Sequence, residues 1–563
     1  MTENLKFEAP GPGAWKTEPI HCGRPIAMFA EADISRAIGE GMASSFERYG
    51  GTVDIIEFKA VNHVMYMSVK PVGAPPNAEG LPPKWLFKIM QLLHPKIRRW
   101  RNRAIQSFEN KSWRPHIEWW DREEKPWAVA HADELRAIDL GVLSDDALIA
   151  HLGDCKVFMK RTLTTHHVLN MCFWLPLGDF LSHAQAWTEC SLSDLLGLFE
   201  GYSEASRGAG EQLRALSAAI TNDGEMMALV ALDTPSEDVI ATLSSRTGPV
   251  ADALADYLDY DGYRIVTGYD VADNMISESP EMIMRVIRSA IEAGDDGQNE
   301  RAGDKLTAGV RAQVSAQHIA QFDELLAEAR STYRIREERG AMGDALSTGL
   351  TRRALLEAGK RLQSQGKLAA ATDMVDATLD EISALLRGGA SPTADEISAR
   401  VQYRADLDMA SVPQYLGAKP TDPPPADWFP QSGRRAYNAF LVVFNLMFKN
   451  GDNSSDAGVV RGLPVFPGTY EGTARVIEDM FDMEKIEDGD ILVARATAPS
   501  YNMIFPMIGA VVTDHGGLLC HAAITAREFG IPAVVGCDDA TAQIADGMRL
   551  SVDGKSGEVR ILG

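Results

Sequence analysis

The residues best suited to chemistry lie near the C-terminus, in the segment GGLLCHAAITAREFG at positions 516–530. His521 follows the glycine pair Gly516 and Gly517 and begins an alanine-rich run that predicts a short helix closed by Gly530. The first turn of a helix presents N–H groups and the positive end of its dipole, which attract anions. A neutral imidazole there could accept a phosphoryl group near pH 7 and pass it on. On these local grounds a histidine that merely caps the helix fits equally well.

A strand and a turn that precede this histidine must position it. The apolar run Ala510–Thr513 predicts a buried strand, and the glycines after it permit positive φ and close approach of a ligand to the backbone. His515 and Cys520 flank the glycine pair and the histidine. We interpret His515 as a structural residue and Cys520 as a small packing residue.

The region around this segment predicts a separate β-rich domain over residues 461–563. Short β-branched runs such as GTARVIE, GDILVAR, PAVVG and GEVRIL alternate there with Gly and Asp. The polar segment Lys449–Gly458 before it has the composition of a flexible linker. The proline-rich segment Ala418–Gly433 cannot continue a helix. Between them, Ala439–Phe448 predicts a buried helix that is too short to span a bilayer.

The remainder of the chain predicts a mainly helical body with some β structure near the N-terminus. Thr52–Lys70 alternates apolar and polar residues and predicts a strand pair. From about Asp145 to Arg400, apolar residues recur every three or four positions, as in a helix. The predicted organisation is therefore a body over 1–417, a connecting region over 418–460 and the C-terminal domain over 461–563.

Composition limits the classes of partner. The 563 residues carry a formal net charge of −24, which argues against nucleic acid and against an anionic membrane surface. The basic segment Lys96–Arg103 is a local exception; a solvated helix face and a phosphate-binding role both remain open. The six cysteines have no zinc or disulfide spacing and the N-terminus has no signal pattern, so we expect a cytoplasmic protein.

Four motifs occurring in order, GLPVFPGTYEGTARVIED, DGDILVARATAP, AVVTDHGGLLCHAAITAREFGIPAVVG and DGMRLSVDGKSGEVRIL, resemble the phosphohistidine domain of the PEP-utilising enzymes. The resemblance implies a β/β/α swivelling domain, with His521 as the phosphorylated residue and Gly516 and Gly517 beside the phosphoryl group. Leu519 departs from the family pattern, since the dikinases carry a hydroxyl residue there, and this puts threonine-based regulation in doubt.

The body more weakly resembles the drug-binding domain of the rifampicin phosphotransferases, through segments that include YRIREERG and DMVDATLDEI. The resemblance implies that Arg336, Glu337 and Arg339 line the place where phosphohistidine meets the acceptor; a solvated helix face is the alternative. We take His166, His167 and Trp174 as candidates for acceptor binding. Nine of the ten tryptophans precede residue 190, which suits a pocket for a planar ring, although tryptophans also fill cores.

No glycine-rich ATP loop and no barrel with metal-binding carboxylates are recognisable in the sequence. The chain therefore resembles the acceptor-binding and histidine half of a split phosphotransferase, with ATP and Mg²⁺ on a separate ATP-grasp subunit and no metal or tightly bound cofactor of its own. The expected acceptor is a phenol, most simply a 4-hydroxyphenyl ketone. Alternatives are an antibiotic-type acceptor, the substrate of a condensing ligase, or a non-enzymatic regulatory or docking module.

Overall fold

The computed structural model describes residues 6–18, 22–75, 80–202, 211–231, 234–265, 269–293, 302–419, 421–448, 458–477, 483, 485–497, 501 and 504–562. By internal contacts the chain divides into two compact units. Unit 1 contains residues 1–180, 268–273 and 338–441, and unit 2 contains residues 181–267, 274–337 and 442–563. Helical residues that we assigned to the body therefore cluster in part with the C-terminal domain.

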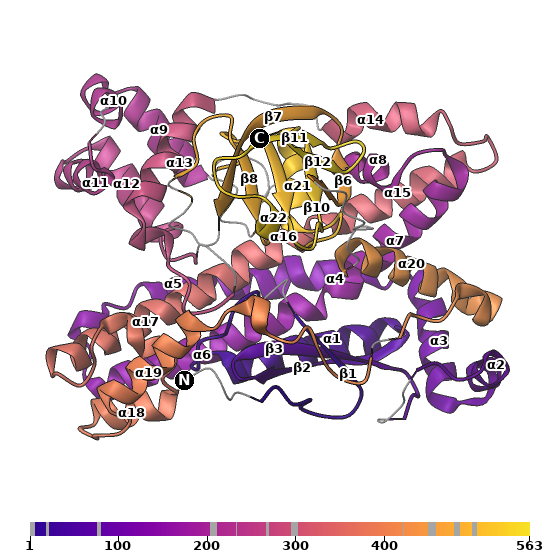
Figure 1. The fold of residues 1–563 in the computed structure, drawn as a ribbon, viewed down its shortest axis with the longest axis horizontal. Helices are drawn as coiled ribbons and strands as arrows, with labels where there is room; N and C mark the ends of the chain where they lie inside the picture. The colour runs from indigo at the N-terminus through magenta and orange to yellow at the C-terminus, as the bar shows by residue number, and fades with distance from the viewer. Residues whose placement is uncertain are drawn as a thin grey trace. The chain divides into compact units, whose positions relative to one another are not determined.

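Unit 1 combines a four-stranded sheet with a layer of helices (Figure 1). Its strands run in the order β2-β3-β1-β4 and are β1 (Ala14–Thr17), β2 (Val53–Val61), β3 (Val64–Pro71) and β4 (Tyr415–Gly417). Its helices include α1 (Glu31–Tyr49), α2 (Lys84–Leu93), α3 (Pro95–Glu109), α4 (Trp113–Trp119), α5 (Lys125–Arg136), α6 (Asp145–Val168), α17 (Ala345–Ser364), α18 (Leu379–Leu386) and α19 (Ala394–Asp406). The strand pair predicted within residues 52–70 is confirmed as the antiparallel β2–β3 hairpin.

A glycine brings two helices of unit 1 into close contact. α1 packs against both β2 and α6. A Cβ at Gly41 on α1 would lie 2.4 Å from the carbonyl oxygen of Thr164 and 2.7 Å from the Cβ of His167. Only glycine therefore allows α1 to approach the last turns of α6, where two of the candidate histidines lie.

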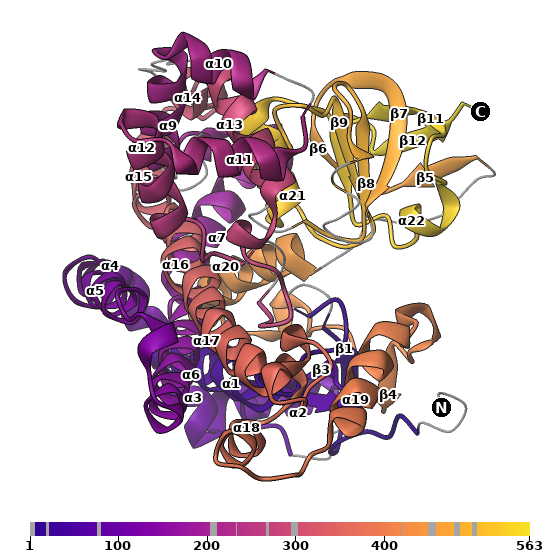
Figure 2. The ribbon, with the colours of Figure 1, turned by 90° about the vertical axis from the view of Figure 1, so that its left-hand side faces the viewer.

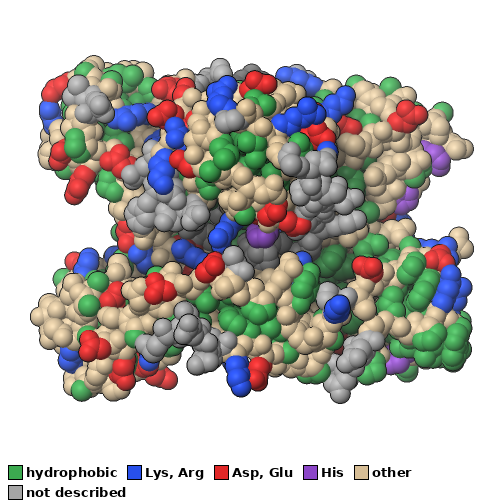
Figure 3. All heavy atoms as spheres, viewed as in Figure 1, with side chains coloured by type: hydrophobic (Ala, Val, Ile, Leu, Met, Phe, Trp, Pro, Cys, Tyr) green, Lys and Arg blue, Asp and Glu red, His purple; other side chains and the backbone are tan. Residues whose placement is uncertain are grey.

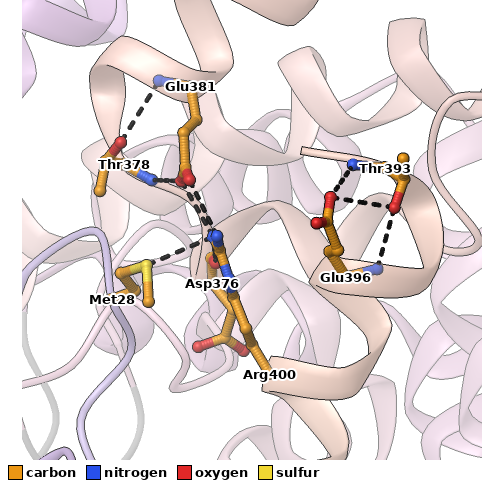
Figure 4. A network of polar contacts seen from close by, with 7 residues as sticks. All are labelled: Met28, Asp376, Thr378, Glu381, Thr393, Glu396 and Arg400. Carbon is orange, nitrogen blue, oxygen red and sulfur yellow. Dashed lines mark hydrogen bonds and ion pairs between the residues drawn. The ribbon is translucent and has the colours of Figure 1, made fainter. Parts of the chain in front are cut away.

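Two capping boxes start neighbouring helices of unit 1 (Figure 4). Thr378 and Glu381 satisfy each other's backbone N–H groups at the start of α18, and Thr393 and Glu396 do so at the start of α19. Arg400 on α19 donates to both carboxylate oxygens of Glu381, at 2.9 and 2.8 Å. The guanidinium thus links the middle of α19 to the start of α18.

Unit 2 contains a helical part and the C-terminal sheet domain. The helices include α8 (Leu192–Leu196), α9 (Glu211–Thr221), α10 (Gly224–Val230), α11 (Ser236–Ser245), α12 (Pro249–Tyr260), α13 (Pro280–Ala293), α14 (Ala302–Arg311) and α15 (Ile319–Tyr333). Leu216, Ile220, Val239, Leu243 and Ile287 are fully buried in the apolar core that these helices share.

The C-terminal domain is built on an eight-stranded sheet with the order β5-β12-β11-β7-β8-β9-β10-β6. The strands are β5 (Val459–Arg461), β6 (Leu463–Phe466), β7 (Thr469–Ile477), β8 (Ile491–Ala494), β9 (Ala510–Thr513), β10 (Ala533–Val535), β11 (Arg549–Asp553) and β12 (Glu558–Ile561). The four strands β7 to β10 are parallel, and α21 (His521–Phe529) packs on β9, β10 and β6 (Figure 2). The predicted fold class, a mainly helical body with N-terminal β structure and a C-terminal β domain, is confirmed.

The connecting region is described only in part. The helix predicted at Ala439–Phe448 belongs to α20 (Gln431–Phe448), in which Ala439 and Val443 are fully buried and Asn445 is exposed. The predicted linker Lys449–Gly458 lies outside the described residues except for its last residue. Within the described ranges no helix is long and apolar enough to cross a membrane.

The basic segment on α3 carries several ion pairs. Lys96 contacts Asp54 at 2.6 Å, and Arg103 contacts Glu47 at 3.0 Å. The neighbouring helix α2 exposes hydrophobic side chains, with Trp85 65% and Leu93 70% accessible. Figure 3 shows hydrophobic and basic side chains gathered at the edge where Figure 1 draws these two helices.

The His116 ring in unit 1 makes the stability of the protein depend on pH. The ring is 1% exposed and its Nδ1 lies 2.8 Å from the hydroxyl of Tyr49. Burial, assisted by Arg48, lowers the pKa of His116 to about 3. Since an unfolded histidine titrates near pH 6.5, the unfolded state binds more protons below that pH. This contribution to stability is therefore lost as the pH falls from about 6.5 toward 3.

We predict that His116→Gln is less stable than the wild type at pH 7, and that its deficit shrinks as the solution is acidified. The wild type should lose up to about 1.4 kcal/mol per pH unit below pH 6.5 through this group, and the variant should not. Melting temperatures of both proteins between pH 7 and pH 5 measure the difference. A deficit that stays constant with pH would contradict the prediction.

Candidate active site

The local structure around His521 is the predicted strand, turn and helix. The strand β9 is buried at all four residues, and α21 begins at His521 itself. The helix ends at Gly530, whose left-handed conformation (φ 66°) allows its N–H to bond the carbonyl of Arg527. His521 therefore occupies the first turn of α21, where backbone donors and the helix dipole favour an anion.

Thr497 holds the imidazole, and sequence reasoning missed it. It follows β8 by three residues, whereas His521 follows the adjacent parallel strand β9. Because the carboxyl ends of parallel strands meet at one edge of a sheet, segments far apart in sequence converge there. The Thr497 Oγ1 lies 2.8 Å from Nδ1 of His521. The sequence feature that could have indicated Thr497 is the segment ARATAP at the end of a predicted buried strand.

The imidazole of His521 is kept neutral by its surroundings. Desolvation, followed by the positive charge of Arg336, lowers the pKa of His521 to about 3. Phe505, 1% exposed, meets the ring edge-on at 6.1 Å between centroids. The second nitrogen, Nε2, lies 3.3 Å from Oγ1 of Thr525, one turn further along α21. A neutral imidazole is the nucleophilic form, because its second ring nitrogen keeps a lone pair.

Arg336 provides positive charge beside this histidine. It lies on the short helix α16 (Ile335–Arg339), and its guanidinium donates to the carbonyl oxygen of Leu519 and to the carboxylate of Glu337. Both side chains are largely buried, with 13% and 15% accessible. The structure thus brings the predicted residues Arg336 and Glu337 together with His521 within unit 2.

The peptide groups of Leu519 are held at both ends. Its N–H donates to the carbonyl oxygen of Leu446, in the last turn of α20, at 3.1 Å. Its carbonyl oxygen accepts from Arg336. The backbone two residues before His521 is therefore tied to two other helices of the chain, and these bonds do not depend on the side chain of Leu519.

The glycine pair has two separate structural roles. Gly516 adopts φ +126°, which an L side chain rarely takes, and a Cβ there would lie 2.7 Å from Sγ of Cys520. A Cβ at Gly517 would lie 1.9 Å from the carbonyl oxygen of Leu446. The sequence predicted positive φ and close approach of a ligand; the positive φ is found at Gly516, and at Gly517 the close neighbour is the chain itself.

The two other residues named near the histidine have backbone roles. Cys520 is the N-cap of α21, and its sulfur lies 3.4 Å from the N–H of Ala523. Burial raises the pKa of its thiol, which disfavours the thiolate form. The N–H of His515 donates to the carbonyl oxygen of Arg495 at 2.8 Å, and its own carbonyl accepts from Thr513.

The remaining predicted residues belong to unit 1. Arg339, 4% exposed, donates to the carbonyl oxygen of His166 and to Oδ1 of Asn170. The Asn170 Nδ2 lies 3.3 Å from Nδ1 of His167, and the two histidine rings are 4.6 Å apart. Arg339, His166 and His167 are thus neighbours, and the segment RIREERG is shared between the two units.

Trp174 lies in the core of unit 1. Its side chain is fully buried and its ring packs against Phe46, Phe173 and Phe440. Its Nε1 has no hydrogen-bond partner among the described residues. An acceptor could reach this ring only if the surrounding phenylalanines moved.

No group of three or more His, Cys, Asp and Glu side chains suited to a metal ion occurs in the part of the chain that the structure describes. Near His521, the groups whose charge or donors suit an anion are the guanidinium of Arg336 and the backbone N–H groups at the start of α21.

Two family models match parts of this chain. Residues 486–557 match the family model of the PEP-utilising enzyme mobile domain, and residues 192–356 match that of the rifampicin phosphotransferase fourth domain. The chain therefore contains a domain of the PEP-utilising enzymes and a domain of the rifampicin phosphotransferases, as the sequence resemblance predicted.

Three relatives show the extent of the similarity. The rifampicin phosphotransferase of Streptomyces sviceus is 31% identical over 330 residues, which are 55% of this chain and 34% of that protein. The rifampicin phosphotransferase of Bacillus subtilis is 50% identical over 105 residues, 19% of this chain and 12% of its own. The phosphoenolpyruvate synthase of Aeropyrum pernix is 47% identical over 102 residues, 18% and 12% respectively. The matched segments span about a third of these relatives' length or less.

We predict that Thr497→Val slows phosphorylation of His521 about tenfold or more without unfolding the protein. The substitution removes the hydroxyl that orients Nδ1 and keeps the side-chain volume, so the loss should appear in the rate and not in the melting temperature. Single-turnover phosphorylation of both proteins measures it. Thr188→Val is a control, since that hydroxyl donates to the carbonyl of Ala184 in α7 (Asn170–Trp187) and accepts from the N–H of Cys190, away from α21. An unchanged rate in Thr497→Val would show that the Thr497 hydroxyl has no role in the phosphorylation of His521.

We predict that Gly517→Ala destabilises the C-terminal domain by several kcal/mol. The new methyl group would overlap the Leu446 carbonyl, and neither backbone can yield without breaking the Leu446–Leu519 hydrogen bond. Thermal unfolding and limited proteolysis measure the effect. Gly309→Ala is the matched control, because a Cβ there meets nothing within 4 Å. Equal stability of the two variants would contradict the packing role of Gly517.

Proposed function

We propose that the chain is the phosphohistidine-carrying and acceptor-binding subunit of an ATP-dependent phosphotransferase. His521 takes a phosphoryl group, the mobile domain carries it, and a small hydroxyl compound receives it. The observation that carries the proposal is a neutral imidazole at the start of α21 with Arg336 beside it. The match of residues 486–557 to the PEP-utilising enzyme mobile domain supports the same chemistry.

The contacts of the ring indicate which nitrogen reacts. Thr497 lies 2.8 Å from Nδ1, whereas the contact of Thr525 with Nε2 is longer, at 3.3 Å. In the tautomer in which Nδ1–H donates a hydrogen bond to the Thr497 hydroxyl oxygen, Nε2 carries the lone pair and is the nucleophile. A phosphoryl group on His521 would add negative charge where Arg336 and the helix dipole offset it.

A separate ATP-grasp subunit is our proposed phosphoryl donor. It would hold ATP and Mg²⁺, convert ATP to AMP and phosphate, and phosphorylate His521. This part of the proposal rests on the resemblance to split phosphotransferases. It predicts that the chain alone neither binds ATP tightly nor hydrolyses it, and that adding the ATP-grasp protein produces activity.

A phenol is our proposed acceptor, most simply a 4-hydroxyphenyl ketone. A phenol ionises near pH 10 and an electron-withdrawing group lowers this value, so its oxygen needs only modest activation to attack a phosphohistidine. The tryptophan-rich first 190 residues supply flat side chains of the kind that bind planar rings. The match of residues 192–356 to a rifampicin phosphotransferase domain favours an antibiotic as the second candidate.

We predict that His521→Ala abolishes both phosphorylation of the chain and transfer to any acceptor, with the fold retained. With the ATP-grasp protein and ATP, the wild type should gain one acid-labile, base-stable phosphate. Between pH 8 and pH 5 the rate of phosphate formation should not decrease because of protonation of His521, since the pKa of this residue is about 3. Intact-protein mass and peptide mapping measure the phosphate, and His515→Ala serves as the matched control. Phosphate that persists in His521→Ala would overturn the assignment.

The acceptor is tested separately with the reconstituted pair. Phenols of graded acidity, rifampicin and pyruvate are supplied to the phosphorylated chain, and loss of phosphohistidine is followed together with product mass. Aryl phosphate formation supports the phenol proposal. Transfer to rifampicin or pyruvate and to no phenol would reject it while leaving the role of His521 intact.

A further inference from the structure

We propose that the exposed face of α2, together with the basic start of α3, is the docking surface for a partner protein whose contacting surface combines apolar side chains with carboxylates. The inference rests on the proposed function, in which that partner is the ATP-grasp subunit, and adds to it the place where the subunit binds. The surface lies entirely within unit 1. It is also outside both segments that match the family models.

α2 is a short helix that packs on unit 1 through one of its faces. Phe87 meets the rings of Trp428 and Phe429 edge-on, at 5.5 and 5.2 Å between centroids. Gln91 is buried, and its carbonyl oxygen accepts from Arg101 of α3 at 2.6 Å. Since residues four positions apart lie on the same side of a helix, Phe87 and Gln91 define the inward face of α2.

The opposite face of α2 presents large hydrophobic side chains to solvent. These residues are spaced as i, i+4, i+7 and i+8, which places them along one stripe: Trp85, Ile89, Leu92 and Leu93. They are between 44% and 70% accessible. Among the described residues eleven large hydrophobic side chains are exposed, and five of these lie between positions 81 and 93. Single exposed hydrophobic residues are ordinary, whereas a contiguous stripe indicates an interaction site.

The charge around this stripe is opposite to that of the chain as a whole. The chain has 79 acidic and 55 basic residues, but residues 80–108 contain seven Lys and Arg and no Asp or Glu. Some of these cations are paired within unit 1, as Lys84 is with Asp427 at 2.5 Å. Lys88 and Arg98 are exposed and form no ion pair with any residue that the structure describes. The stripe is therefore bordered by positive charge that the carboxylates of a partner would neutralise.

The same charges argue against two other occupants of this surface. In a symmetric dimer of this chain the surface would face itself, and the cations of the two copies would repel each other. An anionic membrane would attract these basic residues, but it would repel the rest of a chain whose net charge is −24. The carboxylates of Asp427 and Glu47, which contact Lys84 and Arg103, are largely exposed and add to that repulsion. A protein partner avoids both penalties, because its carboxylates need to match only this local patch.

Trp85 and Arg98 are the residues from which we expect most of the binding free energy. Interfaces concentrate their binding free energy in a few residues, among which Trp, Tyr and Arg are the most frequent. Burial of the Trp85 ring with Leu92 and Leu93 would supply the apolar contribution. The Arg98 guanidinium can form two parallel hydrogen bonds to one carboxylate. Since stable interfaces contain about 20–30 residues on each side, the stripe would be the centre of a larger contact.

The test measures binding of the ATP-grasp protein to the complete chain, together with phosphorylation of His521. The variants are Trp85→Ala and Arg98→Glu. The first control, Val157→Ala, removes a hydrophobic side chain that is exposed on α6. The second, Arg36→Glu, reverses an exposed charge on α1 that has no ion pair among the described residues. Isothermal titration gives the dissociation constant, and rapid quench gives the phosphorylation rate at each partner concentration.

Loss of a docking surface should change the affinity for the partner and leave the chemical step unchanged. Trp85→Ala should weaken binding about 30-fold or more. Arg98→Glu should weaken it about tenfold at low ionic strength, and less as added salt screens the charges. Both variants should need correspondingly more partner for half-maximal phosphorylation and should reach the wild-type rate at saturation. The controls should bind as the wild type does, and all four variants should keep its melting temperature.

Four results would overturn the inference. Unchanged affinity in both variants would show that the partner binds elsewhere, and a lower melting temperature of Trp85→Ala would show that the rest of the chain covers the stripe. Wild-type dimers in light scattering, or binding to phosphatidylserine vesicles, that are lost in Trp85→Ala would assign the surface to self-association or to a membrane. A failure of the proposed function looks different. The wild type would then neither bind the ATP-grasp protein nor be phosphorylated by it, and the partner named here would be rejected as well.

Discussion

The candidate active site depends on how the backbone at Leu519 is held. Its N–H bonds the end of α20 and its carbonyl bonds Arg336, so the start of α21 is fixed by two helices from other parts of the sequence. The same contacts explain why position 517 has no room for a side chain and why a guanidinium lies beside a histidine. Burial, followed by the positive charge of Arg336, lowers the pKa of His521 and keeps its imidazole neutral.

Each of the two units contains a buried histidine whose ring is kept neutral. At His521 and His116, burial and a nearby arginine disfavour the charged ring. His166 of unit 1 differs from both, because Oδ2 of Asp344 lies 2.5 Å from its Nδ1.

The sequence predicted the elements that are local. The strand Ala510–Thr513, the helix that begins at His521 and the hairpin within residues 52–70 each follow from residue periodicity, turn residues and caps. Contacts that depend on pairing between distant segments could not be predicted. Thr497 reaches His521 only because β8 and β9 are parallel neighbours, a fact of sheet order and not of spacing.

The π-helical turn at Gly340–Asp344 carries a consequence for how such a chain can change over evolution. Deleting one residue from this turn would restore an ordinary α-helix, so the segment would keep its secondary structure. Every residue on one side of the deletion would nevertheless rotate by about 100° around the helix axis relative to the other side. Asp344 would then point away from α6 although no ionisable residue had been replaced. Deletion of a single codon could thus remove the contact between Asp344 and His166 while the helix itself remained.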